Sequence, residues 1–236
     1  MIPKIIHYCW FGGKELPPLA KKCIASWEKF CPGWQIIQWN EDNFDVSRYA
    51  YTKYCYEQGK WAFLSDFVRL AVVMELGGVY LDTDVELVKP LDALLEYEAF
   101  YGFENESVVN TGHGFGAVPE QETVEVLLAE YLDLQPGENG DYALIACPRH
   151  NTRGLKKLGL VKNGQRQTVA GAEILPVDWL NPYEYVTGTM NKTENTVAIH
   201  WYNQSWVPQR DKLRAKLTKP FHKLFGVDCF RWLKRR

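Results

Sequence analysis

An apolar run that ends in two glycines, followed by a β-branched segment with two acids, constrains the fold of this chain most. Residues 60–76 are apolar almost all round, which predicts a buried helix. Residues 77–88 begin with Gly-Gly, which ends the helix, and then read as a strand that delivers Asp82 and Asp84 at its carboxyl end. Side chains two apart on a strand point to the same side, so both carboxylates face one site. Because like charges this close repel, we expect a divalent cation or a proton between them.

The stretches around this segment alternate between strand and helix patterns. Residues 2–10 are apolar and β-branched, residues 17–30 carry apolar side chains at helical spacing behind two prolines, and residues 34–39 read as a second strand. Further helices are predicted at 47–58, 91–98 and 123–132, and further strands at 99–103, 173–177 and 196–200. Of the 236 residues, 46% are apolar, enough for a full core. We expect an α/β protein with one mixed, mostly parallel sheet flanked by helices.

Charge is unevenly distributed along the chain. Residues 209–236 contain ten Lys/Arg and two Asp, whereas residues 1–208 contain the other seventeen Lys/Arg and twenty-seven Asp/Glu. We therefore expect one acidic domain at 1–208 and a basic amphipathic helical tail at 209–236. Such a tail either caps the domain as a solvated helix or contacts an anionic membrane surface, and the interleaved apolar residues favour the membrane. The acidic body argues against nucleic acid as a partner.

The cysteines and the apolar runs bear on the compartment. Six cysteines show no CxxC pair, which favours buried free thiols in a reducing compartment. No signal-peptide pattern is visible, and no uncharged apolar run approaches the length of a membrane span. We expect a cytoplasmic protein, placed at the inner face of the cell membrane where the tail binds lipid.

Two charged residues interrupt the apolar helix. Asp66 and Arg69 are three apart and share a face. On a solvated helix they would form an ordinary ion pair of little energy. Because burial makes unpaired charge costly, we expect them to pair with each other or with a ligand. Arg69 suits a phosphate, and Asp66 suits sugar hydroxyls.

Two further residues lie where strands are predicted to end. His200 follows a short apolar strand, and it is either an ordinary structural histidine or a third metal ligand beside Asp82 and Asp84. Trp10 ends the first strand, and it either packs in the core or stacks on a flat base or sugar. Carboxylates beyond the end of a strand in an α/β sheet suit Mg²⁺ or Mn²⁺ with a phosphorylated substrate.

Four segments of the sequence together resemble glycosyltransferase family 32, which includes yeast-type mannosyltransferases and bacterial capsular polysaccharide transferases. The catalytic domains of the large clostridial glucosylating toxins are similar more distantly. The blocks that carry the resemblance are residues 2–12, Ser65-Asp66-x-x-Arg69, Gly77-Gly78-Val79-Tyr80-x-Asp82-x-Asp84 and residues 200–206. The resemblance is dense over residues 1–92 and thinner beyond. It implies a GT-A fold with a Rossmann-like sheet, a nucleotide-sugar donor, a divalent cation (Mn²⁺ or Mg²⁺), and transfer with retention of anomeric configuration.

The same resemblance assigns roles to individual residues. The residues it places against the nucleotide, its sugar or its phosphates are Trp10, Ser65, Asp66, Arg69, Tyr80, Asp82, Ser205 and Trp206. The residues it places on the metal are Asp82, Asp84 and His200. The expected catalytic residues are Asp82, Asp84 and Arg69, since the metal would neutralise the departing diphosphate and Arg69 would stabilise the same charge.

We therefore expect a metal-dependent, retaining transferase that moves a hexosyl group from a UDP-hexose to a lipid-linked saccharide acceptor in bacterial surface polysaccharide synthesis. Asp82-Thr83-Asp84-Val85 also imitates the phosphatase signature of haloacid-dehalogenase enzymes, in which the first Asp is a nucleophile. That signature normally lies on an early strand with a second acidic pair downstream, which this sequence lacks. A non-catalytic carbohydrate- or metal-binding module is a third interpretation, but it leaves Asp66 and Arg69 unexplained.

Overall fold

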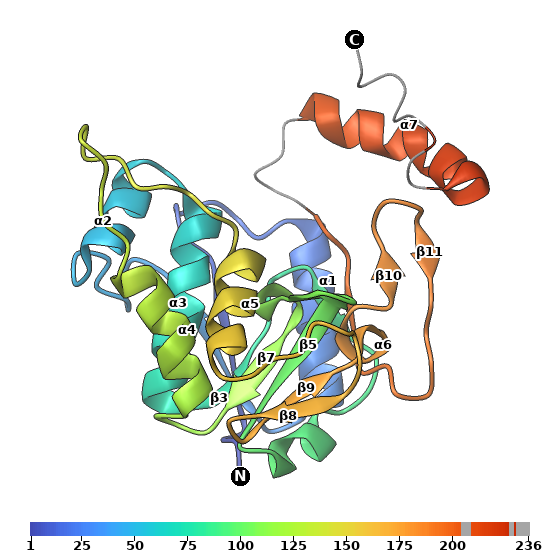
Figure 1. The fold of residues 1–236 in the computed structure, drawn as a ribbon, viewed down its shortest axis with the longest axis horizontal. Helices are drawn as coiled ribbons and strands as arrows, with labels where there is room; N and C mark the ends of the chain where they lie inside the picture. Colours follow the sequence, from blue (N-terminus) through green and yellow to red (C-terminus); the bar gives the residue numbers. More distant parts are fainter. Residues whose placement is uncertain (204–208, 227–228, 230–236) are drawn as a thin grey trace.

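A mixed eight-stranded sheet runs through the body of the protein, in a computed structural model that describes residues 1–203, 209–226 and 229 (Figure 1). The strand order is β2-β1-β3-β7-β5-β9-β8, with β6 paired to β5. β1 is parallel to β2 and β3, and β5 is parallel to β9, whereas β7 and β8 run opposite to their neighbours. Five strands (β2, β1, β3, β5 and β9) thus point the same way, which confirms the predicted mostly parallel sheet.

The strands of this sheet are β1 (Ile5–Cys9), β2 (Gln35–Trp39), β3 (Gly78–Tyr80), β5 (Ala99–Asn105), β6 (Val108–Val109), β7 (Phe115–Ala117), β8 (Gln167–Val169) and β9 (Ala172–Leu175). Two small antiparallel pairs lie beside it, formed by β4 (Val85–Leu87) with β12 (Ala198–His200) and by β10 (Tyr183–Glu184) with β11 (Thr189–Met190). The predicted strands at 99–103, 173–177 and 196–200 correspond to β5, β9 and β12.

Helices cover both faces of the sheet (Figure 1). α1 lies on one face, and α2, α3, α4 and α5 gather on the other. The helices are α1 (Pro18–Phe30), α2 (Ala50–Glu57), α3 (Trp61–Leu76), α4 (Glu122–Leu132), α5 (Cys147–Lys157), α6 (Val177–Leu180) and α7 (Gln209–Phe225), with short 3₁₀ helices at Asp92–Glu96 and Thr111–His113. Among the described residues, no helix is both long and apolar enough to cross a membrane.

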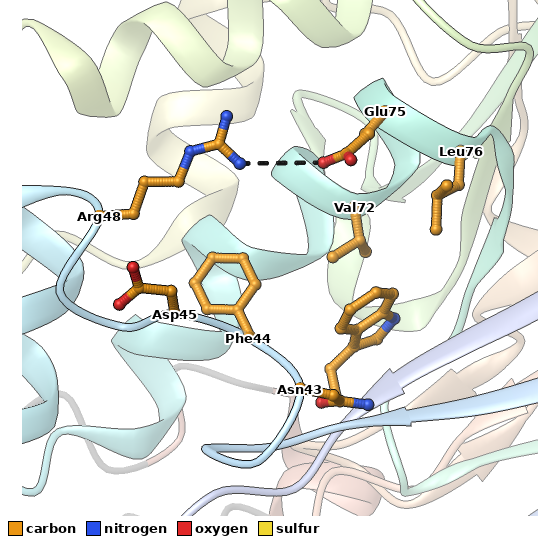
Figure 2. Close-up of a pocket in the computed structure, with 8 residues that line it drawn as sticks. Asn43, Phe44, Asp45, Arg48, Val72, Glu75 and Leu76 are labelled. Atoms are coloured by element: carbon orange, nitrogen blue, oxygen red, sulfur yellow. Dashed lines mark ion pairs between the residues drawn. The ribbon is translucent and has the colours of Figure 1, made fainter.

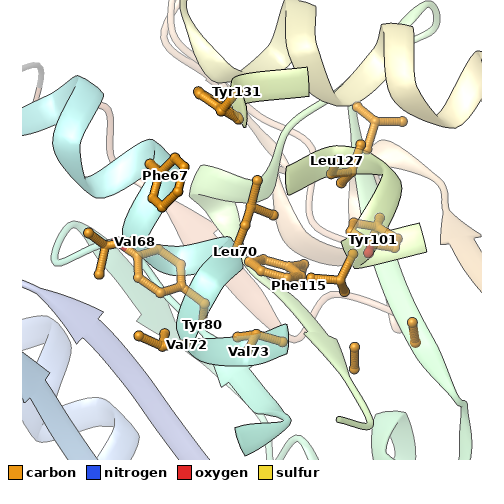
Figure 3. Packing of buried hydrophobic residues seen from close by; sticks show 14 of the residues in the cluster. Phe67, Val68, Leu70, Val72, Val73, Tyr80, Tyr101, Phe115, Leu127 and Tyr131 are labelled. Atoms are coloured by element: carbon orange, nitrogen blue, oxygen red, sulfur yellow. The ribbon is translucent and has the colours of Figure 1, made fainter. Parts of the chain in front are cut away.

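The buried helix predicted at 60–76 is confirmed as α3. Its apolar side chains pack between the sheet and α4, as Figure 3 shows for Phe67 and Leu70 against Phe115 and Tyr131. The helix ends at Gly77, whose φ of 64° lies in the left-handed region that glycine tolerates. A Cβ at Gly77 would lie 2.7 Å from Cδ of Pro119, so the close approach also requires glycine.

A buried histidine holds the glycine pair onto β1. The Trp39 indole N–H donates to Nδ1 of His7 (3.1 Å), so His7 keeps its proton on Nε2 and donates it to the carbonyl of Gly77 (2.8 Å). A Cβ at Gly78 would lie 2.8 Å from the same Nε2. This packing fixes the point where α3 turns into β3, and hence the position of the acids that follow.

The stretch 77–88 is not one strand, contrary to the prediction. β3 ends at Tyr80, and β4 leaves the main sheet to pair with β12. Asp82 and Asp84 lie in the turn between them, which the Val85 N–H closes on the Asp82 carbonyl (2.9 Å). The Asp82 N–H donates to the carbonyl of Gly112 (3.3 Å), in the segment before β7. A turn, rather than the two-residue period of a strand, therefore brings the acids together.

Helix α5 was not predicted, because its sequence contains weak helix formers. Pro148 lies in its first turn, where no backbone N–H is needed. Gly154 lies against α4, where a Cβ would be 2.7 Å from Cδ2 of Leu127, so the glycine allows the two helices to approach closely. All six cysteines are free thiols, and five of them are buried, as the sequence predicted.

Candidate functional site

Asp82, Asp84 and His200 come together just beyond the carboxyl ends of β1 and β3. A ligand atom from each lies within 4.8 Å of the other two. His200 ends β12, and its pairing opposite Val85 of β4 carries it to the acidic turn. Its Nε2 lies 3.2 Å from Oδ1 of Asp84. The three residues predicted as metal ligands are therefore neighbours, although more than a hundred residues separate His200 from the two acids in sequence.

The donor set of this cluster fits a divalent cation. Asp84 accepts hydrogen bonds from His200 and from the backbone N–H of Asn203 (2.7 Å), and Asp82 accepts from the Tyr80 hydroxyl (2.9 Å). Two carboxylates and one imidazole, close enough to reach the same ion, form a set that suits a divalent cation. Which metal binds stays a prediction.

The ionisation of the cluster shows a shortage of positive charge. Burial raises the pKa of Asp82 to about 6, with Asp84 adding to the effect and Arg69 opposing it. Burial also disfavours charge on His200 and Asp84, but their mutual attraction outweighs it, so the pKa of His200 is raised and that of Asp84 is lowered. Protonation of His200 thus compensates the negative charge of the two carboxylates, as a bound metal cation would do.

We expect Mn²⁺ to bind more weakly as the pH falls from 8 to 6. Protons must leave His200 and Asp82 before these side chains bind a metal, and both pKa values are raised, so protons compete in this range. The affinity should fall by about tenfold per pH unit for each proton displaced. Calorimetric titration with Mn²⁺ at several pH values measures this slope. A slope that is unchanged in His200→Ala would contradict the ligand assignment.

Arg69 forms ion pairs with two of the predicted site carboxylates, those of Asp66 and Asp82. Its Nη2 lies 3.0 Å from Oδ1 of Asp66 and 2.9 Å from Oδ1 of Asp82, and its side chain is only 3% exposed. Its Nε donates to the Ser65 carbonyl (3.2 Å) and its Nη1 to the Cys147 thiol (3.4 Å). The helix pair expected from the sequence is therefore a buried bridge between α3 and the acidic turn. Contact of Arg69 with the donor stays a prediction.

Asp66 is anchored on its other side by α5. The backbone N–H of Cys147, at the first turn of α5, donates to Oδ2 of Asp66 (3.2 Å). Burial raises the pKa of Asp66, while Arg69 and this N–H oppose the rise. Two elements thus define the position of Asp66, and its contact with sugar hydroxyls stays a prediction.

Asn110 and Gly112 belong to the site but were not predicted as individual residues. Oδ1 of Asn110 accepts the Gly112 N–H (2.7 Å) and lies 3.3 Å from the Cys147 sulfur. The Gly112 Cα approaches so closely that an added Cβ would meet Oδ2 of Asp82 at 2.7 Å and Nη1 of Arg69 at 3.3 Å. The only sequence signal was the glycine-rich run 110–116, which says nothing about this contact.

We expect Gly112→Ala to abolish donor turnover while leaving the fold intact. Gly112 does not have a left-handed φ, so alanine fits the backbone, and the added methyl displaces the Asp82 carboxylate and the Arg69 guanidinium. Gly137→Ala is the matched control, because no atom lies within 3.4 Å of a Cβ there. Nucleotide release and thermal unfolding of both variants test this, and normal turnover in Gly112→Ala would show that the close contact is not needed.

The remaining predicted donor residues lie at this edge or outside the described part of the chain. Trp10 follows β1, is half-buried, and donates its indole N–H to the Lys14 carbonyl (2.5 Å). Tyr80 is buried beneath Asp82, with the Arg69 guanidinium 4.8 Å from its ring centre. Ser205 and Trp206 lie outside the described residues, so their predicted contacts with the diphosphate stay predictions.

The segment after His200 folds over the acidic turn. The Trp201 N–H donates to the Asp84 carbonyl (2.9 Å), and the Trp201 indole donates to Glu86 (2.8 Å). Tyr202 has a φ of 51°, which is rare for a residue with a side chain, and its hydroxyl accepts from Asn181 (2.7 Å). Strained backbone of this kind is concentrated at functional sites.

A cavity of the described chain lies away from the acidic cluster. This cavity, of about 250 Å³, lies between the β2–α2 loop and the end of α3, with Phe44 and Val72 facing it and Arg48 and Glu75 3.9 Å apart at its edge (Figure 2). None of its lining residues belongs to the acidic cluster.

Comparison with known proteins agrees with this arrangement. The family model "Glycosyltransferase sugar-binding region containing DXD motif" matches residues 17–101, which include the Asp82-x-Asp84 turn. Inositol phosphoceramide mannosyltransferase 1 of Schizosaccharomyces pombe is 27% identical over 130 residues, which cover 50% of this chain and 39% of that protein. Inositol phosphoceramide mannosyltransferase 3 of the same yeast is 32% identical over 111 residues, which cover 42% and 29%. The chain therefore matches well under half the length of these relatives.

The fold also matches a solved structure. A glycosyltransferase involved in glycosylation of the major capsid of PBCV-1 superimposes with a TM-score of 0.50, over 92% of this chain and 100% of that one, at 11% identity. This likeness confirms the predicted fold. Residues 17–101 thus match a glycosyltransferase sugar-binding region containing a DXD motif, and the chain is similar in fold to a solved glycosyltransferase, in agreement with the resemblance of the sequence blocks.

Proposed function

We propose that this chain is a metal-dependent, retaining glycosyltransferase that moves a hexosyl group from a nucleotide-sugar, a UDP-hexose, to a saccharide acceptor. The observation that carries the proposal is the convergence of Asp82, Asp84 and His200 beyond β1 and β3, with both acids inside the region 17–101 that matches the family model. Ligands of open α/β sheets bind at this edge. The buried Asp66–Arg69 pair adds polar groups beside the cluster that a binding module or a phosphatase would not require.

The chemistry follows from the residues around the cluster. A divalent cation held by Asp82, Asp84 and His200 supplies Lewis-acid stabilisation of a departing diphosphate when it is bound. Arg69 favours the ionised forms of Asp66 and Asp82 and orients both carboxylates. Because the protein already holds each of these acids by hydrogen bonds, we propose same-face displacement without a glycosyl-enzyme intermediate. The bond from the sugar to the diphosphate breaks as the acceptor oxygen bonds to the same carbon, and a leaving phosphate oxygen takes the hydroxyl proton.

We propose a lipid-linked acceptor at the cytoplasmic face of a bacterial membrane, in surface polysaccharide synthesis, with α7 in contact with anionic lipid. Two observations support this. The relatives are named for transfer to inositol phosphoceramide, which is a lipid, and α7 is basic with exposed Leu and Phe side chains. The free buried thiols suit a reducing compartment. The relatives' names also favour a second donor class, a mannosyl donor such as GDP-mannose.

The purified full chain should hydrolyse its donor slowly in the absence of acceptor. The test incubates it with Mn²⁺ and UDP-glucose, UDP-galactose, UDP-N-acetylglucosamine or GDP-mannose, and measures the free nucleoside diphosphate. Release from one donor that stops when EDTA removes the metal supports the proposal and names the donor. Cleavage of a generic phosphate ester instead would support a haloacid-dehalogenase-like phosphatase. Donor binding without release, even with saccharide acceptors present, would support a binding module.

A further inference from the structure

Helix α7 meets the body through one polar side. Nζ of Lys219 donates to the Tyr183 hydroxyl (2.8 Å) and lies 4.3 Å from the ring centre of Tyr185, so this lysine sits on the loop side of the β10–β11 hairpin. Ala215 and Thr218, which lie on the same side of the helix as Lys219, are also half-buried. The face that a soluble amphipathic helix would leave in water is here the face that docks on the protein.

The opposite side of α7 is apolar and exposed. Leu213, Leu217, Phe221 and Leu224 follow one another at spacings of three and four, so they form one stripe. They are 50–76% exposed. Residues two apart lie on roughly opposite sides of a helix, which places Leu217 away from both Ala215 and Lys219. The helix is thus docked with its polar side inward and its apolar side outward.

The charges on α7 indicate which kind of partner covers this apolar stripe. Arg210, Arg214, Lys216 and Lys223 are exposed, and Asp211 is the only acid in the helix. A second copy of this acidic chain would attract the basic residues, but it would leave the apolar stripe without a matched surface. The boundary of an anionic bilayer accepts both, since the acyl region takes Leu and Phe while the phosphates attract Lys and Arg.

We propose that α7 lies in the plane of an anionic bilayer surface, with the stripe of Leu213, Leu217, Phe221 and Leu224 in the lipid and the Lys219 side still docked on the β10–β11 hairpin. The inference rests on the membrane contact proposed above. It adds which face enters the lipid and what the opposite face holds. In this arrangement α7 connects the membrane surface to the β10–β11 hairpin through a fixed contact, instead of acting as a flexible basic tail.

The docking of α7 on the hairpin also determines where the site lies relative to the lipid. The ring of Tyr183 lies near that of Trp201 (5.5 Å between ring centres), and the ring of Tyr185 lies near that of Tyr202 (5.5 Å). Trp201 in turn donates its N–H to the Asp84 carbonyl. The same two tyrosines therefore contact both Lys219 of α7 and the segment over the acidic turn. A sugar whose lipid anchor lies in the same leaflet is brought to this edge of the sheet.

Fluorescence at single labelled positions distinguishes the two faces. In a Cys229→Ser background, which leaves the five buried thiols, Leu217→Cys and Ala215→Cys are each labelled with a polarity-sensitive dye and mixed with phosphatidylglycerol-containing or pure phosphatidylcholine vesicles. We expect a shift to shorter wavelength at position 217 with anionic vesicles and none at position 215. Equal shifts at both positions, a shift only at 215, no shift at 217, or equal shifts with neutral vesicles would each overturn the proposal.

Vesicle sedimentation of unlabelled variants gives a second, independent test. Leu217→Ser and Phe221→Ser should each reduce binding to anionic vesicles by about tenfold or more, since each removes a side chain that the lipid buries. Thr218→Ala, on the docked side, should bind as the unaltered chain does. Donor hydrolysis is measured in parallel. If the unaltered chain hydrolyses no donor but still binds vesicles as expected, the proposed chemistry is wrong and the membrane orientation of α7 stands. Salt-sensitive self-association in place of vesicle binding would overturn it in favour of a second copy.

Discussion

Asp84→Ala is expected to abolish metal-dependent release of nucleotide, by about 10³-fold or more, and to leave the protein folded. A metal ligand that stabilises the departing charge contributes several kcal/mol to the transition state. Asp84 also accepts the His200 ring N–H (3.2 Å) and the Asn203 backbone N–H (2.7 Å), so its loss frees the segment that folds over the turn. Both effects act on turnover, because Asp84 is partly exposed and its removal opens no apolar core.

The comparison that isolates the carboxylate uses three variants. Asp84→Asn keeps a group that accepts the Asn203 N–H but binds a divalent cation poorly, so it should be as inactive as Asp84→Ala while unfolding at the temperature of the unaltered chain. Asp92→Ala removes an exposed acid that pairs with Lys4, away from the acidic cluster, and it should keep full activity. Nucleotide release, calorimetric Mn²⁺ binding and thermal unfolding are measured on each. Full activity in Asp84→Asn would end the metal-site interpretation.

Arg69→Met is expected to destabilise the fold by about 3–5 kcal/mol and to remove activity. Arg69 is 3% exposed and bridges Asp66 and Asp82, so methionine leaves two carboxylates facing each other without their countercharge. Burial already raises the pKa of both acids, and the loss of Arg69 raises it further. Folded-state pKa values above the unfolded ones favour folding at low pH, and that benefit is lost as the pH rises through them. The deficit should therefore be larger at pH 8 than at pH 5.

Urea unfolding at the two pH values measures this effect. Arg48→Met is the control, since Arg48 is exposed and lies 3.9 Å from Glu75, and its loss should change the free energy of unfolding by less than about 0.5 kcal/mol. A double variant, Arg69→Met with Asp66→Asn, should recover part of the lost stability by removing one uncompensated charge. A pH-independent deficit would show that packing of the Arg69 side chain, rather than its charge, supports the site.

The amino-acid sequence by itself determined the α/β class, the buried helix before the acids and the identity of the acids. These follow from local rules: α3 is recognisable because its residues are apolar on all sides, and it stops at Gly77 because only glycine accepts the backbone there. The same rules failed for α5, where Pro148 and Gly154 satisfy a helix terminus and a helix contact that no local pattern reveals.

Only the tertiary structure decided how the site is assembled. The strand period predicted two acids on one face, yet β3 ends at Tyr80 and a turn presents them. His200 reaches Asp84 because β12 pairs with β4, and Gly112 reaches Asp82 because the backbone after β6 crosses the same edge. Pairings between segments far apart in the chain depend on packing of the whole sheet. The sequence thus identifies the side chains that are able to bind a metal and a sugar, and the fold determines the distances between those side chains.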